Sequence, residues 1–226
     1  MVFTQLLSLA LAATAAAAPL VPRQITCAEG LYIIVARGSN QPVGEGSVGP
    51  VGDMIEARIP GSYSVAVDYP AVIIGDGDTY FSSVIDGIND AREKVEAYVA
   101  ACGSGSRIAL VGYSQGGQVM TDLLAGGTGK PAPLAEQYRQ NIVGAAVFGD
   151  PRFNAGQAIS AGQSTSNGIF ARISSRARLN TYSNVLRSYC DEGDPFCSSD
   201  FNLAVHFAVV EKYAQAATDF IVGVAS

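Results

Sequence analysis

The stretch that decides the fold runs from Arg107 to Leu124, RIALVGYSQGGQVMTDLL, and contains Gly112-Tyr113-Ser114-Gln115-Gly116. The apolar residues before Gly112 predict a short buried strand, and the residues from Gln118 onward predict a helix. A Gly-x-Ser-x-Gly sequence between a strand and a helix is typical of the nucleophile elbow of α/β hydrolases. The glycines on both sides permit the strained turn that exposes the hydroxyl of Ser114.

The chain contains one histidine, His206. A serine hydroxyl is a weak nucleophile until a base takes its proton, so an imidazole that activates Ser114 can only be His206. That imidazole needs a carboxylate to orient its second ring nitrogen. The acidic residues shortly before His206 are Asp191, Glu192, Asp194 and Asp200. The order serine, acid, histidine is that of α/β hydrolases, but spacing alone does not choose among the four acids.

An oxyanion hole for this chemistry requires two hydrogen-bond donors. We expect the first to be the backbone N–H of Gln115, directly after the nucleophile. We expect the second to come from Ser39, which follows the first predicted strand and offers both an N–H and a hydroxyl.

The rest of the chain alternates between predicted strands and helices. Strands are predicted over 31–36, 63–67, 107–112, 141–148 and 185–188, and helices over 48–59, 81–101, 118–124 and 206–222. Residues 155–178 are rich in Ser, Gly and Asn and give no clear prediction. This alternation predicts an α/β fold, a three-layer α/β/α sandwich with a parallel sheet covered on both faces. Ligands of such sheets bind at the carboxyl ends of the strands, where Ser114 and Ser39 are expected.

The amino-terminal residues are typical of a secretory signal. Residues 1–17 end in an apolar run of small side chains that is too short to span a bilayer, and 18–26 form a possible pro-segment. We expect residues 27–226 to form a single domain, with no later membrane-spanning helix. The net charge is −6 and no basic cluster occurs, so nucleic acid and anionic membrane surfaces are not expected partners.

Four cysteines in a secreted chain predict two disulfides, with three possible connectivities. Cys190 and Cys197 are close in sequence, whereas Cys27 precedes the first predicted strand and Cys102 ends a predicted helix. We therefore predict the pairs Cys27–Cys102 and Cys190–Cys197. A zinc site is the alternative, but these spacings fit no common zinc motif.

No cofactor is expected. Gly44-Glu-Gly46-Ser-Val-Gly49 fits the G-x-G-x-x-G pattern of dinucleotide-binding proteins, and Asp68 follows about 20 residues later. In that fingerprint the first glycine directly follows its strand, whereas here seven residues separate Gly44 from Ala36. We interpret these glycines as a loop that leads into a helix.

Further motifs accompany the elbow. They are Ala36-Arg-Gly-Ser39, Asp68-Tyr-Pro-Ala71, Gly149-Asp-Pro151 and Ser188-Tyr-Cys-Asp-Glu-Gly-Asp-Pro-Phe-Cys197. Together with Cys27, the elbow and His206, they resemble the cutinase and acetylxylan esterase family of secreted fungal esterases (carbohydrate esterase family 5). The resemblance runs from Cys27 to about Tyr213 and implies a five-stranded, largely parallel sheet between helices, with an accessible serine.

The resemblance also implies roles by position. It makes Ser114 the nucleophile, Asp194 the acid and His206 the base, with Ser39 and Gln115 in the oxyanion hole. It implies the same cysteine pairing as the sequence positions.

The expected function is a secreted serine esterase that hydrolyses carboxylic esters through an acyl-enzyme and acts as a monomer. Arg37-Gly-Ser39 is more like cutinases, whereas Tyr69-Pro-Ala71 and Ser188-Tyr-Cys-Asp191 are more like acetylxylan esterases. Cutin, acetylated xylan and small short-chain esters therefore stay open as substrates. The apolar residues of 198–205 either line an acyl pocket or merely pack. The alternative from another class is a non-catalytic wall- or surface-binding protein that retains the fold.

Overall fold

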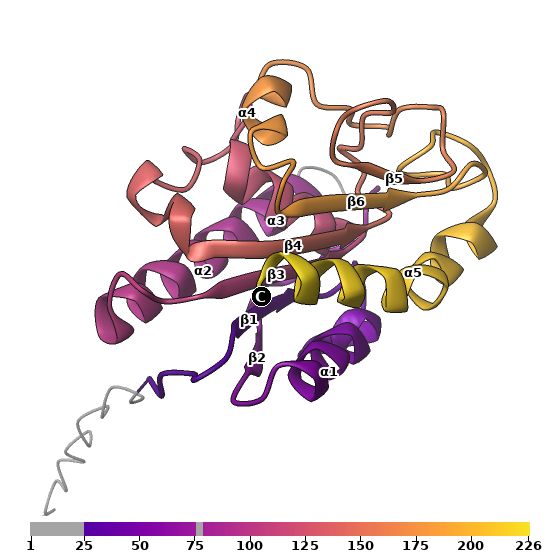
Figure 1. The fold of residues 1–226 in the computed structure, drawn as a ribbon. Coiled ribbons are helices and arrows are strands. Elements are labelled where there is room, and N and C mark those ends of the chain that lie inside the picture. Colours follow the sequence, from indigo (N-terminus) through magenta and orange to yellow (C-terminus); the bar gives the residue numbers. More distant parts are fainter. Residues whose placement is uncertain (1–24, 76–78) are drawn as a thin grey trace, which may run out of the picture.

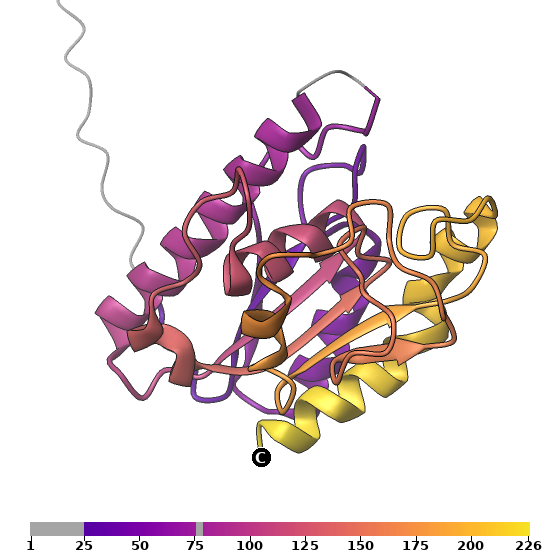
Figure 2. The same cartoon turned by 90° about the horizontal axis from the view of Figure 1, so that it is seen from above.

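A computed structural model describes residues 25–75 and 79–226 of the chain. The predicted signal peptide at 1–17 and residues 18–24 of the possible pro-segment lie outside the described residues. The described part is a twisted sheet with helices on both faces, as Figures 1 and 2 show, so the predicted three-layer α/β/α sandwich is confirmed.

The sheet has six strands in the order β2-β1-β3-β4-β6-β5, and every neighbouring pair is parallel. The strands are β1 (Tyr32–Ala36), β2 (Tyr63–Ala66), β3 (Ile108–Tyr113), β4 (Ile142–Phe148), β5 (Ser160–Gly162) and β6 (Leu186–Cys190). The five-strand prediction missed β5, an edge strand of three residues within the segment that gave no clear prediction. Its Ser-Ala-Gly sequence has no apolar run, and only its pairing with β6 makes it a strand.

The helices are α1 (Gly49–Arg58), α2 (Thr79–Cys102), α3 (Gln115–Ala125), α4 (Arg176–Asn180) and α5 (Leu203–Val224), with 3-10 turns η1 (Gly46–Val48) and η2 (Glu136–Asn141). Helices α2 and α3 cover one face of the sheet, and α1 and α5 cover the other (Figure 1). The last helix begins three residues before the predicted start, because the side chain of Asn202 accepts a hydrogen bond from the N–H of Ala204 and caps it.

Alternate residues of the central strands enter two separate apolar cores. Ile34 and Leu110 pack under α2 and α3, whereas Ile33 and Val111 pack under α1 and α5. Because both faces are covered, β1 and β3 are buried throughout and read as continuous apolar runs.

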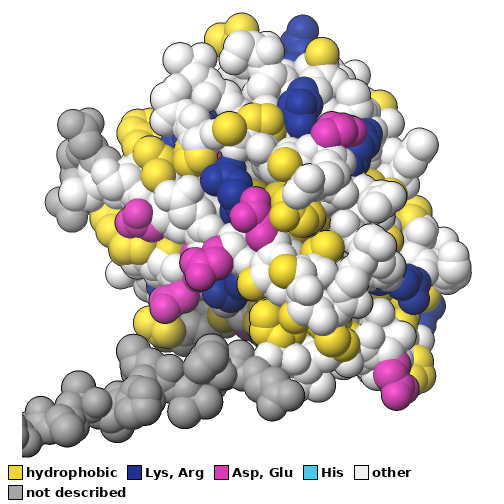
Figure 3. Space-filling model, turned by 90° about the vertical axis from the view of Figure 1, so that its left-hand side faces the viewer, with side chains coloured by type: hydrophobic (Ala, Val, Ile, Leu, Met, Phe, Trp, Pro, Cys, Tyr) yellow, Lys and Arg dark blue, Asp and Glu magenta, His cyan; other side chains and the backbone are white. Residues whose placement is uncertain are grey.

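The parallel arrangement brings the carboxyl ends of β1, β3, β4 and β6 to one edge of the sheet, at the right of Figure 1. The opposite side is seen in Figure 3, where acidic, basic and apolar side chains are intermixed rather than gathered by kind. Ser39, Ser114 and Asp194 follow strands at the carboxyl edge, and His206 lies in the first turns of α5.

Candidate active site

Ser114 lies at the tip of a strained turn between β3 and α3. Its φ is +55°, a conformation that costs a non-glycine residue energy and that the nucleophile elbow requires. A Cβ on Gly112 would lie 2.4 Å from the carbonyl oxygen of Gly116, and one on Gly116 would lie 2.1 Å from that of Ala36. Neither position therefore accepts a side chain, which is the physical reason for both glycines of the motif.

The lone imidazole lies between the serine and a carboxylate. His206 Nε2 is 2.9 Å from Ser114 Oγ, and His206 Nδ1 is 2.7 Å from Asp194 Oδ2. Both contacts are of hydrogen-bond length, and they join residues 92 and 12 positions apart in the sequence. His206 is buried in the first turns of α5, and Asp194 is fully buried.

Aromatic side chains fix the orientation of His206. The ring of Phe196 meets the imidazole edge to face, with centroids 4.6 Å apart, and the ring of Tyr113 lies 5.0 Å away. The Tyr113 hydroxyl donates a hydrogen bond to the backbone oxygen of His206 over 3.1 Å. Burial raises the pKa of this hydroxyl, and the charge of Asp194 raises it further, so Tyr113 remains a donor.

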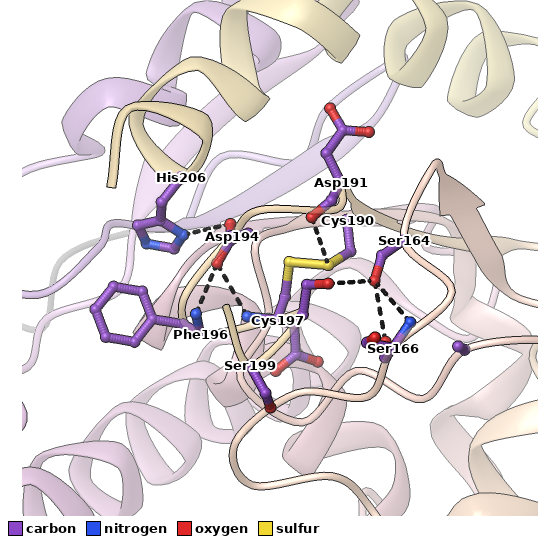
Figure 4. Close-up of a disulfide and its surroundings, with 12 residues drawn as sticks. Ser164, Ser166, Cys190, Asp191, Asp194, Phe196, Cys197, Ser199 and His206 are labelled. Carbon is purple, nitrogen blue, oxygen red and sulfur yellow. Dashed lines mark hydrogen bonds and ion pairs between the residues drawn. A yellow bond between two sulfur atoms is a disulfide. The ribbon is translucent and has the colours of Figure 1, made fainter. Parts of the chain in front are cut away.

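The short disulfide loop positions the carboxylate (Figure 4). Cys190 and Cys197 are bonded across seven positions, and Asp194 lies between them. Asp194 Oδ1 accepts hydrogen bonds from the N–H groups of Phe196 at 2.8 Å and Cys197 at 3.0 Å. One carboxylate oxygen is thus held by the loop, which leaves the other for His206. The second disulfide joins Cys27 to Cys102.

The other acidic candidates lie elsewhere. Asp191 binds Lys212 Nζ at 2.5 Å and the Tyr213 hydroxyl at 2.6 Å on α5. Its burial raises the pKa of the carboxyl, but the hydrogen bonds of Lys212, Tyr213 and the Gln163 N–H outweigh burial and lower the pKa overall. Glu192 and Asp200 are exposed.

The predicted oxyanion-hole residues face the same place. Ser39 and Ser114 line one cavity, and neither donor of Ser39 forms a hydrogen bond within the described part of the chain. Gln115 begins α3, where a backbone N–H has no carbonyl of a preceding turn to bind. The Gln115 side chain is fixed by Ser83 Oγ at 3.1 Å and the Val72 oxygen at 2.8 Å.

A buried arginine holds the Ser39 loop, a feature that sequence reasoning missed. The Arg37 guanidinium donates to the backbone oxygens of Gln41, Val67 and Tyr69. Gln41 in turn accepts from the Gly38 N–H at 3.0 Å. The loop is therefore fixed to the end of β2 before any substrate binds. Gly46 of the G-x-G-x-x-G pattern belongs to the same loop structure, because a Cβ on it would lie 2.1 Å from Gln41 Oε1.

An apolar cavity of about 350 Å³ opens beside Ser114 and His206. Its lining includes Ile73, Ile74, Tyr80, Pro151, Phe196, Leu203 and Phe207. Of the apolar residues in 198–205, Leu203 lines this cavity, whereas Phe201 is 95% exposed and lies apart from its lining. Most of these residues come from loops, where no periodic pattern marks a residue as part of a binding surface.

Residues 25–75 and 79–226 contain no group of three or more His, Cys, Asp or Glu side chains arranged to hold a metal ion. None of the helices within that part of the chain combines the length and the apolar character needed to cross a membrane.

The fold, the strained elbow and the serine–histidine–aspartate contacts define a protein of the α/β hydrolase class. A family model described as Cutinase matches residues 27–224, so the chain belongs to the cutinase family. Cutinase 11 of Verticillium dahliae is 33% identical over 96% of this chain and 76% of its own length. Acetylxylan esterase 2 of Talaromyces purpureogenus is 33% identical over 84% of this chain and 85% of its own length.

Solved structures agree with these relatives. An acetylxylan esterase determined at 0.90 Å resolution superposes with a TM-score of 0.80, at 29% identity, over 89% of this chain and 100% of that one. The chain is therefore an ester hydrolase of the cutinase and acetylxylan esterase type.

Proposed function

We propose that the chain is a secreted serine esterase in which Ser114, His206 and Asp194 form the catalytic triad. The observation that carries this proposal is the pair of contacts made by His206, 2.9 Å to Ser114 Oγ and 2.7 Å to Asp194 Oδ2. The two disulfides and the predicted signal peptide support secretion.

In the proposed mechanism, His206 Nε2 takes the proton of Ser114 as Oγ attacks the ester carbonyl. The N–H of Gln115 and the donors of Ser39 stabilise the negative charge that develops on the carbonyl oxygen. His206 then gives the proton to the leaving alcohol, which leaves an acyl group on Ser114. Water, activated by the same imidazole, releases the acid. Asp194 keeps the Nδ1 proton in place and stabilises the imidazolium that forms.

The cavity supports a substrate with an aliphatic acyl group, as in cutin or another plant cell-wall polyester. Its lining is mostly apolar, and its volume of about 350 Å³ exceeds what an acetyl group fills. Acetylated xylan is the second candidate, because the relatives and structures that match over most of the chain include acetylxylan esterases. We propose that the enzyme acts as a monomer.

The triad is tested by exchanging acids one at a time. Asp194→Asn should lower kcat by about 10⁴-fold, because the amide cannot hold the required tautomer of His206. Asp191→Asn and Asp200→Asn are matched controls that should keep most of the rate, since neither contacts His206. The readout is hydrolysis of p-nitrophenyl butyrate, with circular dichroism to verify folding. A large loss in Asp191→Asn with normal folding would overturn the assignment of the acid.

Two measurements separate the remaining alternatives. A fluorophosphonate reagent should label Ser114 in the wild type and fail to label Ser114→Ala. Absence of labelling in the folded wild type would favour a non-catalytic wall-binding protein. Rates on p-nitrophenyl esters from acetate to octanoate should rise beyond acetate if the apolar cavity holds the acyl chain, whereas a sharp acetyl preference would favour acetylated xylan.

A further inference from the structure

A second depression adjoins the active site on its α2 side and is not used by the triad. This depression, which we name the cationic groove, has a volume of about 610 Å³ and is open to solvent. Its charged residues are Lys130 and Arg152, and no carboxylate side chain lines it. Its apolar lining includes Phe81, Ile169, Phe170 and Ile173.

The positive charge in the cationic groove is only partly neutralised by the protein. Lys130 forms neither a salt bridge nor a side-chain hydrogen bond among the described residues, and its Nζ rests 4.7 Å from the centroid of the Phe81 ring. Arg152 Nε lies 3.2 Å from Asp122 Oδ1, but Arg172 shares that same oxygen at 2.8 Å. The two arginines thus share Asp122, the buried Asp150 also acts on Arg172, and Lys130 forms no ion pair among the described residues.

Partial burial is the main reason that the charge of Lys130 is unfavourable when the groove is empty. Burial lowers the pKa of Lys130; Asp122 opposes this effect, and the charges of Arg152 and Arg172 add smaller decreases. An anion in the groove would face Lys130 and Arg152 together and relieve their mutual repulsion.

One layer of side chains separates the cationic groove from the catalytic cavity. Tyr80 lines the cavity, and its neighbour Phe81 lines the groove. Phe170 packs against both rings, and its N–H donates to the backbone oxygen of Pro151 in the cavity wall at 2.9 Å. The cavity and the groove thus lie on the two sides of this aromatic wall, and a ligand that occupies both has to cross it.

The exposed apolar side chains of the groove indicate which kind of molecule carries the anionic group. Phe81 and Ile169 are about two-fifths exposed, and Ile173 is 88% exposed. Such surface favours a ligand whose charged group is carried on an aliphatic chain.

Resting on the proposed esterase function, we propose that the cationic groove binds the free carboxylate of the ester substrate. The substrate class is an aliphatic ester that also carries a carboxylate, as at the acid end of a polyester chain. Lys130 and Arg152 bind the carboxylate, and Phe81 and Ile173 contact the chain that joins it to the ester.

The test compares charged and neutral esters of the same length in Lys130→Gln. One arm uses p-nitrophenyl half-esters of dicarboxylic acids, which carry the carboxylate on the acyl side. The other uses butyrate esters of ω-hydroxy acids, which carry it on the alcohol side. Each is paired with a neutral ester of the same length in which a methyl group replaces the carboxylate, and acid release is followed by pH-stat. In at least one arm, Lys130→Gln should raise KM for the charged ester about three- to tenfold and leave kcat unchanged.

The matched control is Lys94→Gln, which removes a lysine of α2 that pairs with Asp90 and does not line the groove. It should leave all kinetic constants unchanged, as should Lys130→Gln with the neutral esters and p-nitrophenyl butyrate. The preference for the charged ester should also weaken as salt is raised.

Three results would contradict this expectation, each in a different way. Equal effects of Lys130→Gln on charged and neutral esters in both arms would overturn the proposal. Lys130-dependent binding to phosphatidylglycerol vesicles with unchanged ester kinetics would also overturn it and favour a lipid surface. Lack of p-nitrophenyl butyrate hydrolysis by the wild type would instead refute the proposed esterase function.

Discussion

At Gly149 the backbone passes close to the imidazole ring of His206. It follows β4 directly and has a φ of +60°. A Cβ built there would lie 2.8 Å from His206 Cε1 and 2.9 Å from Nδ1. The glycine is thus required both for its backbone conformation and for the space that the imidazole occupies.

We expect Gly149→Ala to lower kcat/KM by about 10²-fold, because a displacement of the imidazole by a fraction of an ångström disturbs both of its contacts. Gly156→Ala is the matched control, since Gly156 has a φ of +69° and open space around its Cβ position. Both variants should lose about 1 kcal/mol of stability from the strained φ, but only Gly149→Ala should lose activity. Equal activity of the two variants would show that the space beside His206 at Gly149 does not affect catalysis.

The residues identified from the sequence and those missed by it play different roles in the site. Ser114 and His206 are identifiable because the proposed chemistry uses their side chains directly, and because His206 is the one histidine of the chain. Gly149 matters because it leaves room for the imidazole ring of His206. Arg37 matters because its guanidinium binds backbone oxygens. Arg37 was visible only as part of a motif, and nothing in the sequence states that its guanidinium binds three carbonyls of distant segments.

Asp191 connects two elements, the end of β6 and the middle of α5. It binds Lys212 and Tyr213 of α5 and also accepts from the Gln163 N–H at 3.0 Å. Burial would raise the pKa of its carboxyl, but these hydrogen bonds lower it overall. The folded-state pKa therefore lies below the unfolded value of about 3.9.

A carboxylate with a lowered pKa stabilises the fold above its unfolded pKa, and this contribution is lost as the pH falls through the folded pKa. We expect the melting temperature of the wild type to fall on acidification below about pH 4. Asp191→Asn should be less stable than the wild type at pH 7, and the difference should shrink at acid pH. A difference in melting temperature between the two proteins that stays constant from pH 7 to pH 2 would refute this role. Thermal denaturation by circular dichroism provides the measurement.

Element boundaries were less predictable than element types. The helix predicted from residue 206 begins at Leu203, although Asn202 is a favourable cap residue visible in the sequence. The strand predicted over 185–188 extends over Leu186–Cys190, because its pairing with β4 reaches Tyr189 opposite Phe148. Such ends are set by a neighbouring strand or a cap rather than by the pattern within the segment.

At the scale of the whole molecule, the two disulfides constrain very different lengths of chain. Cys27–Cys102 closes a separation of 75 residues and ties the amino-terminal segment to the end of α2. Cys190–Cys197 closes only seven and encloses the carboxylate that His206 contacts. In the chain-entropy account, the first stabilises the fold by about 4.5 kcal/mol and the second by about 2.5 kcal/mol.

We expect the two double variants to separate stability from activity. Cys27→Ser with Cys102→Ser should lower the free energy of unfolding more and keep kcat at a temperature where the protein is folded. Cys190→Ser with Cys197→Ser should lower kcat more, because the loop that holds Asp194 is released. Urea unfolding and p-nitrophenyl butyrate hydrolysis measure the two quantities. Full activity without the short disulfide would show that the Phe196 and Cys197 N–H groups suffice to fix Asp194.

The sequence by itself determined the class of fold and named the residues that meet at the candidate site. Buried parallel strands require continuous apolar runs, and a strained serine turn requires glycines, so both leave local patterns between 107 and 124. The order of the six strands, the cavity beside Ser114 and the cationic groove came only from the tertiary structure. They depend on contacts between segments far apart in the chain, and local sequence patterns do not encode which loop packs against which.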